Sequence, residues 1–371
     1  MLSPRLTVLQ MLPALESGGV ERGTLEVAAA LASAGHRSLV MSRGGRLVER
    51  LEAEGSEHLP WPVGEKSPLT LRLVPRLRHL LAERAVDVLH IRSRMPGWVG
   101  WLAWRRMDPH TRPRLVTTVH GLYSPGLYSA VMTRGEAVIA VSETVRRYLL
   151  EHYPRLPSDR VRVIHRGVAA ETFPHGHRPS PEWLTRWRAE RRDLDGKWVL
   201  TFPGRLTRLK GHADFLAIVE RLAERAIPVH GLVVGDGGRK GYAASLAAEA
   251  ARRRLPISFL GHRSDLREVM AVSDVVLSLS RRPESFGRTV LEALSLGVPV
   301  LGYDHGGVGE ILARAWPHGA VPLGDVEAAV DWLVAQHARP ERPPACDAFP
   351  LSRMLDSTLG LYETLAAERR A

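Results

Sequence analysis

The feature that most constrains the fold is an alternation of short apolar, β-branched runs with amphipathic helical stretches along most of the chain. This pattern is typical of parallel sheets wound with helices, because helices cover both faces of such sheets. The strands predicted in the first half are 6–12, 38–41, 86–91, 115–119, 137–141 and 161–164. The helices predicted between them include 20–33, 69–84 and 143–151.

The alternation lapses from 166 to 195, a segment rich in proline and charge that we interpret as an interdomain connection. It then resumes with predicted strands at 198–203, 229–234, 257–260, 275–279 and 298–301. The predicted fold is therefore α/β, with two Rossmann-like, doubly wound domains that face each other across a cleft.

The predicted domains span 1–180 and 181–345, and a C-terminal segment follows at 346–371. Apolar residues recur at helical spacing in that last segment, which predicts an amphipathic helix. We expect this helix to pack on the protein, with the N-terminal domain as its candidate partner.

Composition narrows the class of protein. A chain of 371 residues with 44% hydrophobic and 25% charged residues is expected to fold. Its single cysteine, Cys346, cannot form an internal disulfide, which favours a reducing compartment. The first apolar run is interrupted by Thr7, Gln10 and Pro13, which predicts a strand and not a signal peptide. We expect a cytoplasmic protein whose membrane contact, on the inner face of the cytoplasmic membrane, is peripheral.

The net charge of +11 predicts attraction to an anionic partner, which leaves nucleic acid, lipid headgroups, phosphorylated glycans and sugar nucleotides open. An arginine-rich composition that comes from a high-GC genome would explain the charge equally well. Over 92–106, cations alternate with indoles, as in helices at a membrane interface, although buried tryptophans with outward arginines fit the same pattern. These residues are Arg92, Arg94, Trp98, Trp101, Trp104, Arg105 and Arg106. No nucleic-acid module accompanies them, which disfavours a nucleic-acid-binding protein.

The segment 281–310 is the most informative about chemistry. It places Glu284 and Glu292 eight positions apart, with Gly287 at the expected start of a helix. The first amides of such a helix favour a diphosphate, and the two carboxylates can accept hydrogen bonds from sugar and ribose hydroxyls. Each acid taken alone would be an ordinary surface residue. Their arrangement with Gly287 and the pair 306–307 favours a ligand site.

The segment 204–211 follows the first strand of the second domain and carries Arg205 and Lys210. Both cations belong at the carboxyl end of a strand, where open α/β sheets bind ligands and where they would neutralise a departing diphosphate.

Two further turns and one strand-end histidine are candidates. In the first domain, Ser17, Gly18 and Gly19 form a turn between a strand and a helix that lets a backbone approach a phosphate. Neither this turn nor 235–238 is a complete dinucleotide fingerprint, and both also fit a tight turn without a ligand. His120 ends the strand 115–119. Most histidines are structural, but its strand-end position makes it a candidate beside the transferred sugar.

Together these residues resemble the retaining glycosyltransferases of family 4, which have the GT-B architecture. The resemblance implies that Arg205 and Lys210 bind the donor phosphates and that Glu284 binds the transferred sugar. It implies that Glu292 binds the ribose and that His120 lies beside O6 or the reacting centre, so that His120 and Glu284 are the candidate catalytic residues. The remaining candidate donor-binding residues are Gly18, Gly19, Arg263, Ser285, Phe286, Gly287, Arg288 and Thr289. Front-face departure and attack would retain the anomeric configuration without a protein nucleophile.

The segments 90–94 and 118–124 are similar to a subgroup that builds lipopolysaccharide core. This resemblance implies a lipopolysaccharide core or related cell-envelope glycan as acceptor, with UDP-glucose favoured as donor and GDP-mannose as the alternative. Arg288 and Thr289 depart from the family, where many members carry aliphatics. The Arg288 guanidinium is therefore expected either to contact phosphate or to face solvent.

We expect no cofactor and no metal, because the Asp-x-Asp triplet at 193–195 precedes a strand and does not follow one. The rival predictions on the same fold are non-transferring enzymes, namely a nucleotide-sugar epimerase or a phosphorylase.

Overall fold

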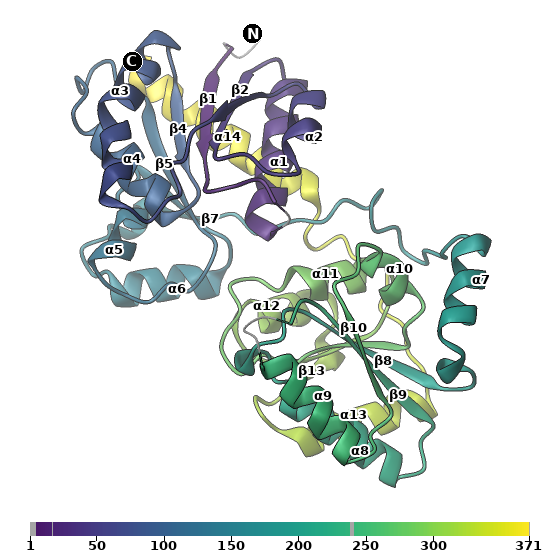
Figure 1. Cartoon of the computed structure of the whole chain (residues 1–371). Coiled ribbons are helices and arrows are strands. Elements are labelled where there is room, and N and C mark those ends of the chain that lie inside the picture. Colours follow the sequence, from purple (N-terminus) through teal and green to yellow (C-terminus); the bar gives the residue numbers. More distant parts are fainter. Residues whose placement is uncertain (1–4, 17, 238–240, 371) are drawn as a thin grey trace. The chain divides into compact units, whose positions relative to one another are not determined.

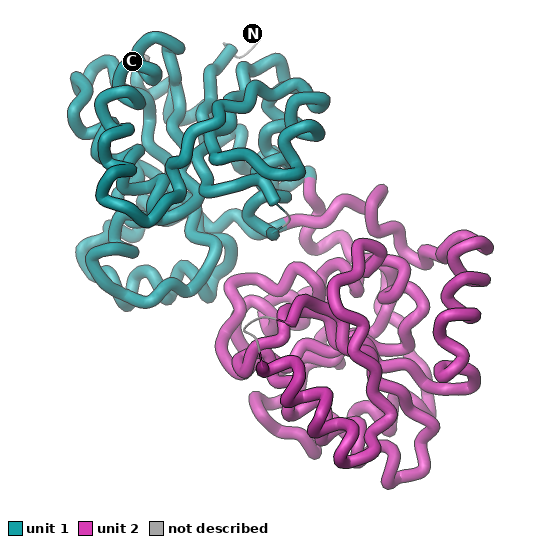
Figure 2. Tube along the Cα trace, viewed as in Figure 1, with its two compact units in different colours: residues 1–166, 352–371 teal, residues 167–351 magenta. Residues whose placement is uncertain are grey.

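The structure is a computed structural model that describes residues 5–16, 18–237 and 241–370. Ser17 of the predicted glycine turn and Gly238 of the 235–238 segment lie outside these ranges. The chain divides into two compact units (Figure 2). Unit 1 comprises the chain up to Arg166 together with the segment from Ser352, and unit 2 comprises Gly167–Leu351. The division thus falls before the predicted boundary at 180, and the returning segment starts after the predicted 346.

Unit 1 contains a seven-stranded parallel sheet in the order β3-β2-β1-β4-β5-β6-β7. Its strands are β1 (Thr7–Met11), β2 (Arg37–Ser42), β3 (Glu57–Pro60), β4 (Val88–Ile91), β5 (Arg114–Val119), β6 (Ala137–Ala140) and β7 (Val161–Val163). Its helices are α1 (Gly19–Ser33), α2 (Val48–Ala53), α3 (Leu73–Glu83), α4 (Arg94–Trp104), α5 (Leu127–Ala130), α6 (Glu143–His152) and α14 (Leu351–Arg370). The chain builds outward from β1 in one direction and from β4 in the other, so the order reverses between these two strands.

The C-terminal helix α14 packs on the sheet of unit 1, beside β4 and β5 (Figure 1). The fully buried Tyr362 of α14 shares a 2.5 Å hydrogen bond with Nδ1 of His90 on β4. The Arg114 guanidinium donates to the Leu365 carbonyl oxygen, and Arg369 donates to Asp87. The last helix of the chain is therefore an integral part of the first unit.

Unit 2 contains a six-stranded parallel sheet in the order β10-β9-β8-β11-β12-β13. Its strands are β8 (Trp198–Pro203), β9 (Val229–Val234), β10 (Ile257–Gly261), β11 (Val275–Ser278), β12 (Val300–Tyr303) and β13 (Ala320–Val321). Its helices are α7 (Pro181–Glu190), α8 (His212–Glu224), α9 (Tyr242–Arg252), α10 (Leu266–Ala271), α11 (Arg288–Ser295), α12 (Gly306–Ala315) and α13 (Val326–Ala338). Here the order reverses between β8 and β11. In open α/β sheets, ligands bind outside the carboxyl ends of the strands at such a reversal.

These elements confirm the predicted fold class of two Rossmann-like α/β domains with a C-terminal helix. The strands β3 and β13 were missed, and both lie at a sheet edge. β3 contains no β-branched residue, and β13 has only two residues, so neither gives a strand pattern. None of the described helices is both long enough and apolar enough to span a bilayer.

The predicted connection 166–195 contains the helix α7, which belongs to unit 2. The Ser180 hydroxyl accepts from the Trp183 amide and caps the helix, with Pro181 in its first turn. Trp183 and Trp187 pack against a cluster that includes Val199. Pro181, one of the prolines that suggested a linker, thus lies at the start of a helix.

Candidate active site

The strand reversal of unit 2 brings Lys210 and Glu284 together. Lys210 ends the loop after β8, Glu284 follows β11, and Lys210 Nζ lies 2.7 Å from Glu284 Oε1. The Ser280 hydroxyl donates to the same oxygen at 2.5 Å. Burial alone would raise the pKa of the Glu284 carboxyl, but Lys210 and Ser280 hold that pKa below its ordinary value. An ionised carboxylate and an ammonium therefore meet at the position where this sheet binds ligands.

Glycine at position 211 permits this approach. Gly211 has φ +83°, and a Cβ there would lie 1.9 Å from the Leu279 carbonyl oxygen at the end of β11. The Arg281 amide also donates to the Leu209 carbonyl oxygen at 2.9 Å. The loop that carries Lys210 thus lies directly on the end of β11, and a side chain at 211 would separate them.

The pair Gly306 and Gly307 supports the segment of Glu284 from the other side. Gly306 has φ +63°, and a Cβ on Gly307 would lie 2.3 Å from Phe286 Cα. The Gly307 amide donates to the Glu284 carbonyl oxygen at 2.8 Å. The glycine pair singled out in the sequence therefore fixes the backbone of Glu284.

Helix α11 begins at the predicted position. Gly287 is its N-cap with φ +103°, and the Val290 amide donates to the Gly287 carbonyl oxygen at 3.0 Å. Helix geometry leaves the first amides of such a helix available to an anion. Ser285 and Thr289 flank this N-terminus. The Phe286 ring instead is 4% exposed and meets Phe349 edge to face, so only its backbone can approach a donor.

The second acid, Glu292, lies on α11 with only 3% of its surface exposed. Arg288 Nε is 3.1 Å from Glu292 Oε1, an i,i+4 pair along the helix. The Arg288 side chain thus turns back onto Glu292 through Nε, and its contact with a donor phosphate stays a prediction. The Glu292 carboxylate that is predicted to bind the ribose is therefore already paired with the Arg288 guanidinium.

The two remaining predicted cations of unit 2 differ. Arg205 is exposed in the loop that ends at Lys210. Arg263 donates to Asp265 at 2.8 Å and to Glu190 at 2.9 Å, and it lies over the Trp187 ring. Arg263 follows the edge strand β10, three strand positions from β11, which corresponds to about 14 Å at ordinary strand spacing. The structure therefore does not bring Arg263 to the Lys210 and Glu284 pair.

In unit 1, His120 follows β5 and pairs with Arg166, which lies beyond β7. Its Nδ1 is 2.7 Å from Arg166 Nη2, and since a guanidinium can only donate, Nδ1 must accept. Burial, Arg166 and Arg92 hold the pKa of His120 well below its ordinary value. His120 is thus a neutral imidazole whose remaining proton is on Nε2.

The glycine turn after β1 leaves space at the N-terminus of α1. A Cβ on Gly19 would meet nothing within 4 Å, and one on Gly18 would meet only the Glu21 carboxylate. Gly18 has an extended backbone with φ −80°. Neither glycine is required by the fold on these grounds, which is consistent with room left for a ligand.

Several residues around the site were not predicted. The buried Asp214 accepts two hydrogen bonds from Arg281 and one from Tyr303, which anchors the segment after β11. His305 contacts the Ser280 carbonyl oxygen at 3.2 Å. The strand-end rule that selected His120 would have selected His305 after β12. It would also have selected Arg166 after β7.

Comparison with known proteins agrees with this fold. Residues 17–172 match the model of Glycosyltransferase Family 4, and residues 185–331 match that of Glycosyl transferases group 1. The chain therefore belongs to the glycosyltransferases of GT-B fold, and it is an enzyme of that class.

Three similar proteins illustrate the range of the class. The crystal structure of a glycosyltransferase from Rickettsia africae ESF-5 covers 97% of this chain and 98% of its own, with a TM-score of 0.83 and 28% identity. The phosphatidyl-myo-inositol mannosyltransferase of Mycolicibacterium smegmatis is 27% identical over 85% of this chain and 80% of its own length. Anabaena HepE in complex with UDP and glucose has a TM-score of 0.76 at 20% identity, covering 98% of this chain and 95% of its own.

Proposed function

We propose that the chain transfers a hexose, with retention of anomeric configuration, from a nucleotide-sugar to a lipopolysaccharide core or related cell-envelope glycan. The observation that carries the donor half of this proposal is the Lys210 and Glu284 pair at the strand reversal of unit 2. A nucleotide-sugar offers a diphosphate to the ammonium and sugar hydroxyls to the carboxylate, so one ligand satisfies both groups.

The transfer itself breaks the bond between the anomeric carbon and the diphosphate oxygen and forms one to an acceptor oxygen. Lys210, Arg205 and the first amides of α11 would stabilise the charge on the departing diphosphate. That diphosphate would take the proton of the acceptor hydroxyl on the same face of the sugar, which retains the configuration. His120 already uses Nδ1 as an acceptor and carries its proton on Nε2, so we assign it as a hydrogen-bond donor to the sugar and not as a base.

UDP-glucose is the favoured donor, and GDP-mannose is the alternative. The fold likeness to a protein solved with UDP and glucose supports the first, and the similarity to a mannosyltransferase supports the second. For the acceptor, the segments 90–94 and 118–124 resemble the core-building subgroup. Each begins in the last two residues of a strand, β4 or β5, at the carboxyl edge of the unit 1 sheet.

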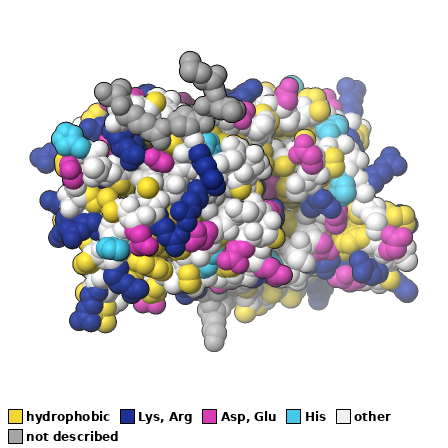
Figure 3. All heavy atoms as spheres, turned by 90° about the horizontal axis from the view of Figure 1, so that it is seen from above, with side chains coloured by type: hydrophobic (Ala, Val, Ile, Leu, Met, Phe, Trp, Pro, Cys, Tyr) yellow, Lys and Arg dark blue, Asp and Glu magenta, His cyan; other side chains and the backbone are white. Residues whose placement is uncertain are grey.

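Peripheral membrane contact remains part of the proposal, with a corrected set of residues. Helix α4 starts at Arg94, so Arg92 precedes it, and Arg92 is only 3% exposed. Trp104 is also buried, whereas the partly exposed Trp101 lies under both Arg105 and Arg134. Figure 3 shows basic side chains interleaved with acidic ones on the face in view, with no uniform basic surface of the kind that binds nucleic acid. Sedimentation with anionic vesicles at low salt tests the membrane contact.

The decisive experiment is nucleotide release by the full chain from UDP-, GDP-, ADP- and dTDP-sugars, with truncated lipopolysaccharide core as acceptor. We expect release from one donor that requires the acceptor and is lost in Glu284→Ala. Lys197→Ala, an exposed substitution before β8, serves as the control. Conversion of the donor sugar without acceptor and without nucleotide release would instead identify an epimerase, and formation of a sugar phosphate from glycan and inorganic phosphate would identify a phosphorylase.

A further inference from the structure

Arg92 is a buried side chain of unit 1 whose hydrogen-bonding groups are only partly paired. It is 3% exposed, and its Nε and Nη1 have no hydrogen-bond partner among the described residues. Arg92 is hydrogen-bonded to the Tyr362 side chain, and the carboxylate charge of Glu26 on α1 also acts on it. A buried guanidinium with two unpaired nitrogens costs free energy, so a structure that keeps one needs a reason for it.

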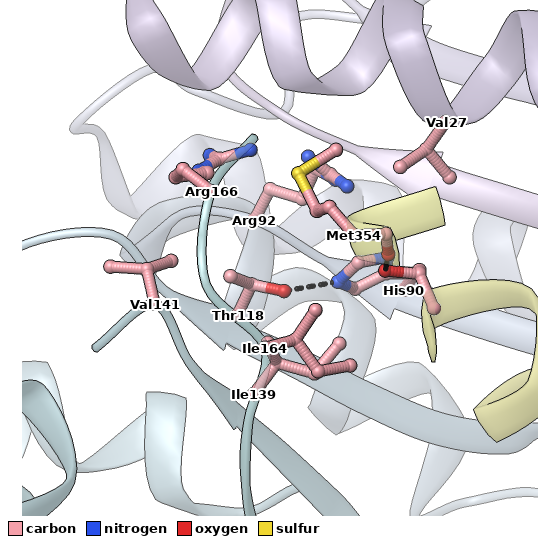
Figure 4. A pocket seen from close by; sticks show the side chains of 10 residues that line it. Val27, His90, Arg92, Thr118, Ile139, Val141, Ile164, Arg166 and Met354 are labelled. Carbon is pink, nitrogen blue, oxygen red and sulfur yellow. Dashed lines mark hydrogen bonds between the residues drawn. The ribbon is translucent and has the colours of Figure 1, made fainter. Parts of the chain in front are cut away.

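A second arginine, Arg166, lies in the surroundings of Arg92. Arg92 and Arg166 line one pocket, and Figure 4 shows both guanidinium groups on the same side of it, above the hydrogen bond between His90 and Thr118. Burial and the two arginines keep His90 and His120 neutral, with the pKa of each well below its ordinary value. Glu26 on α1 is a carboxylate whose charge also reaches Arg92. The two nitrogens of Arg92 that have no partner among the described residues could be satisfied by an anion.

The position of Arg92 is that of a ligand-binding residue. Its amide donates to the Met11 carbonyl oxygen at 3.0 Å, so it lies where the order of the sheet reverses between β1 and β4. That is the place at which an open α/β sheet binds ligands. The pocket has a volume of 20 Å³, which admits one water-sized group and not a sugar ring. Only the tip of a ligand, such as one oxygen of an anionic substituent, can enter.

We propose that Arg92, with Arg166 beside it, recognises an anionic substituent, a phosphate or a carboxylate, on the acceptor glycan. The inference rests on the proposed function for the role of unit 1 as the acceptor side. Arg92 donates from Nε or from Nη1 to one oxygen of an anionic group of the acceptor, in a charge-assisted hydrogen bond. The acceptor is then an acidic or phosphorylated glycan, and a neutral one of the same length binds worse.

The test is calorimetric binding, without donor, of three oligosaccharides of equal length to the full chain. One carries a phosphate, one carries a uronic acid, and one is neutral. We expect about 10- to 100-fold tighter binding of at least one anionic form, the range that a charged hydrogen bond provides. The anion that binds tighter identifies the source. Arg92→Met should remove the preference, while Arg147→Met, at an exposed arginine of α6, should keep it.

A stability measurement separates recognition from a structural role. Because Nε and Nη1 of the buried Arg92 lack partners, Arg92→Met is expected to leave the melting temperature unchanged or to raise it. A lower melting temperature with an unchanged anion preference would show a structural arginine and overturn the inference. Equal binding of the neutral oligosaccharide, no binding of either anionic one at millimolar concentration, or an equal loss in Arg147→Met would overturn it too. Failure of nucleotide release, in contrast, counts only against the proposed function.

Discussion

Each sheet has a cationic side chain at its strand reversal, but the two cations differ in how fully they are paired. In unit 2, Lys210 is 30% exposed and already paired with Glu284. In unit 1, Arg92 is 3% exposed and lacks partners for two of its nitrogens. A diphosphate that binds Lys210 must therefore compete with a carboxylate, whereas an anion at Arg92 fills a deficit. The same fold thus provides one site that is balanced without its ligand and one that is not.

The glycines beside these sites differ in the same way. A Cβ on Gly211 would strike the Leu279 backbone, whereas a Cβ on Gly23 in α1 would strike the guanidinium of Arg166 at 1.9 Å. The Leu279 backbone cannot move without a change in the sheet, whereas the guanidinium of Arg166 can move by a change of side-chain rotamer. Unit 2 fixes its site through main chain, and unit 1 positions its site through side chains.

The largest effect is expected at Lys210. Lys210→Ala removes the cation that would stabilise the departing diphosphate, so kcat/KM should fall about 10²- to 10³-fold. Steady-state nucleotide release measures this, with Lys197→Ala as the control at the opposite end of β8. Equal losses in both variants would contradict the assignment.

A double-mutant cycle sharpens the electrostatic comparison. If Lys210 leaves Glu284 when a donor binds, Lys210→Ala and Glu284→Ala should be non-additive, with a coupling of about 0.5–3 kcal/mol. Calorimetric titration with the nucleoside diphosphate measures the coupling in binding. Additive losses would mean that the pair is not rearranged by the donor.

Gly211→Ala is expected to destabilise the fold. Gly196 also has a positive φ, +67°, but a Cβ there meets nothing within 4 Å. Since both substitutions share the backbone strain and only one meets the end of β11, Gly211→Ala should cost about 1–3 kcal/mol more than Gly196→Ala. Chemical denaturation of both variants gives the difference, and equal losses would break the distinction between the two units.

Gly23→Ala should affect positioning and not stability. The substitution gains about 0.5–1 kcal/mol of helix propensity and pushes Arg166 away from His120. We expect an unchanged or higher melting temperature and a several-fold loss of transfer activity. Gly360→Ala on α14, where a Cβ meets nothing within 4 Å, should gain stability without losing activity. A clear drop in melting temperature for Gly23→Ala would show that the side-chain arrangement is rigid after all.

The smallest effect expected is on the pH dependence of stability. His90 is neutral because burial and two arginines lower its pKa well below the ordinary value, whereas in the unfolded chain it takes a proton below about pH 6.5. Folding stability should therefore fall as the pH drops from 7 to 5, by at most about 1.4 kcal/mol per pH unit for this residue. His90→Gln should lessen the slope, and His79→Gln, at an exposed histidine, should not. The same slope in all three proteins would refute a neutral His90.

The sequence predicted the parts of the molecule that repeat a local pattern. Buried strands such as β8 and the start of α11 at Gly287 follow from hydrophobic runs and one glycine. The sequence predicted that Lys210 and Glu284 belong to one site, because both follow strands, but it did not predict that they form an ion pair. The turn of Arg288 toward Glu292 and the burial of Arg92 depend on rotamers and on packing from distant elements. Tyr362 of α14 is an example, because local periodicity does not predict its contact with Arg92.

The return of α14 to unit 1 has a consequence for how the protein is made. The ribosome completes every residue of unit 2 before it synthesises the helix that covers β4, because unit 1 resumes only at Ser352. Until then His90 and Asp87 have no partner from the C-terminal segment. The first unit to emerge is thus the last that can finish folding, because its sheet lacks α14 until the C-terminal segment has left the ribosome.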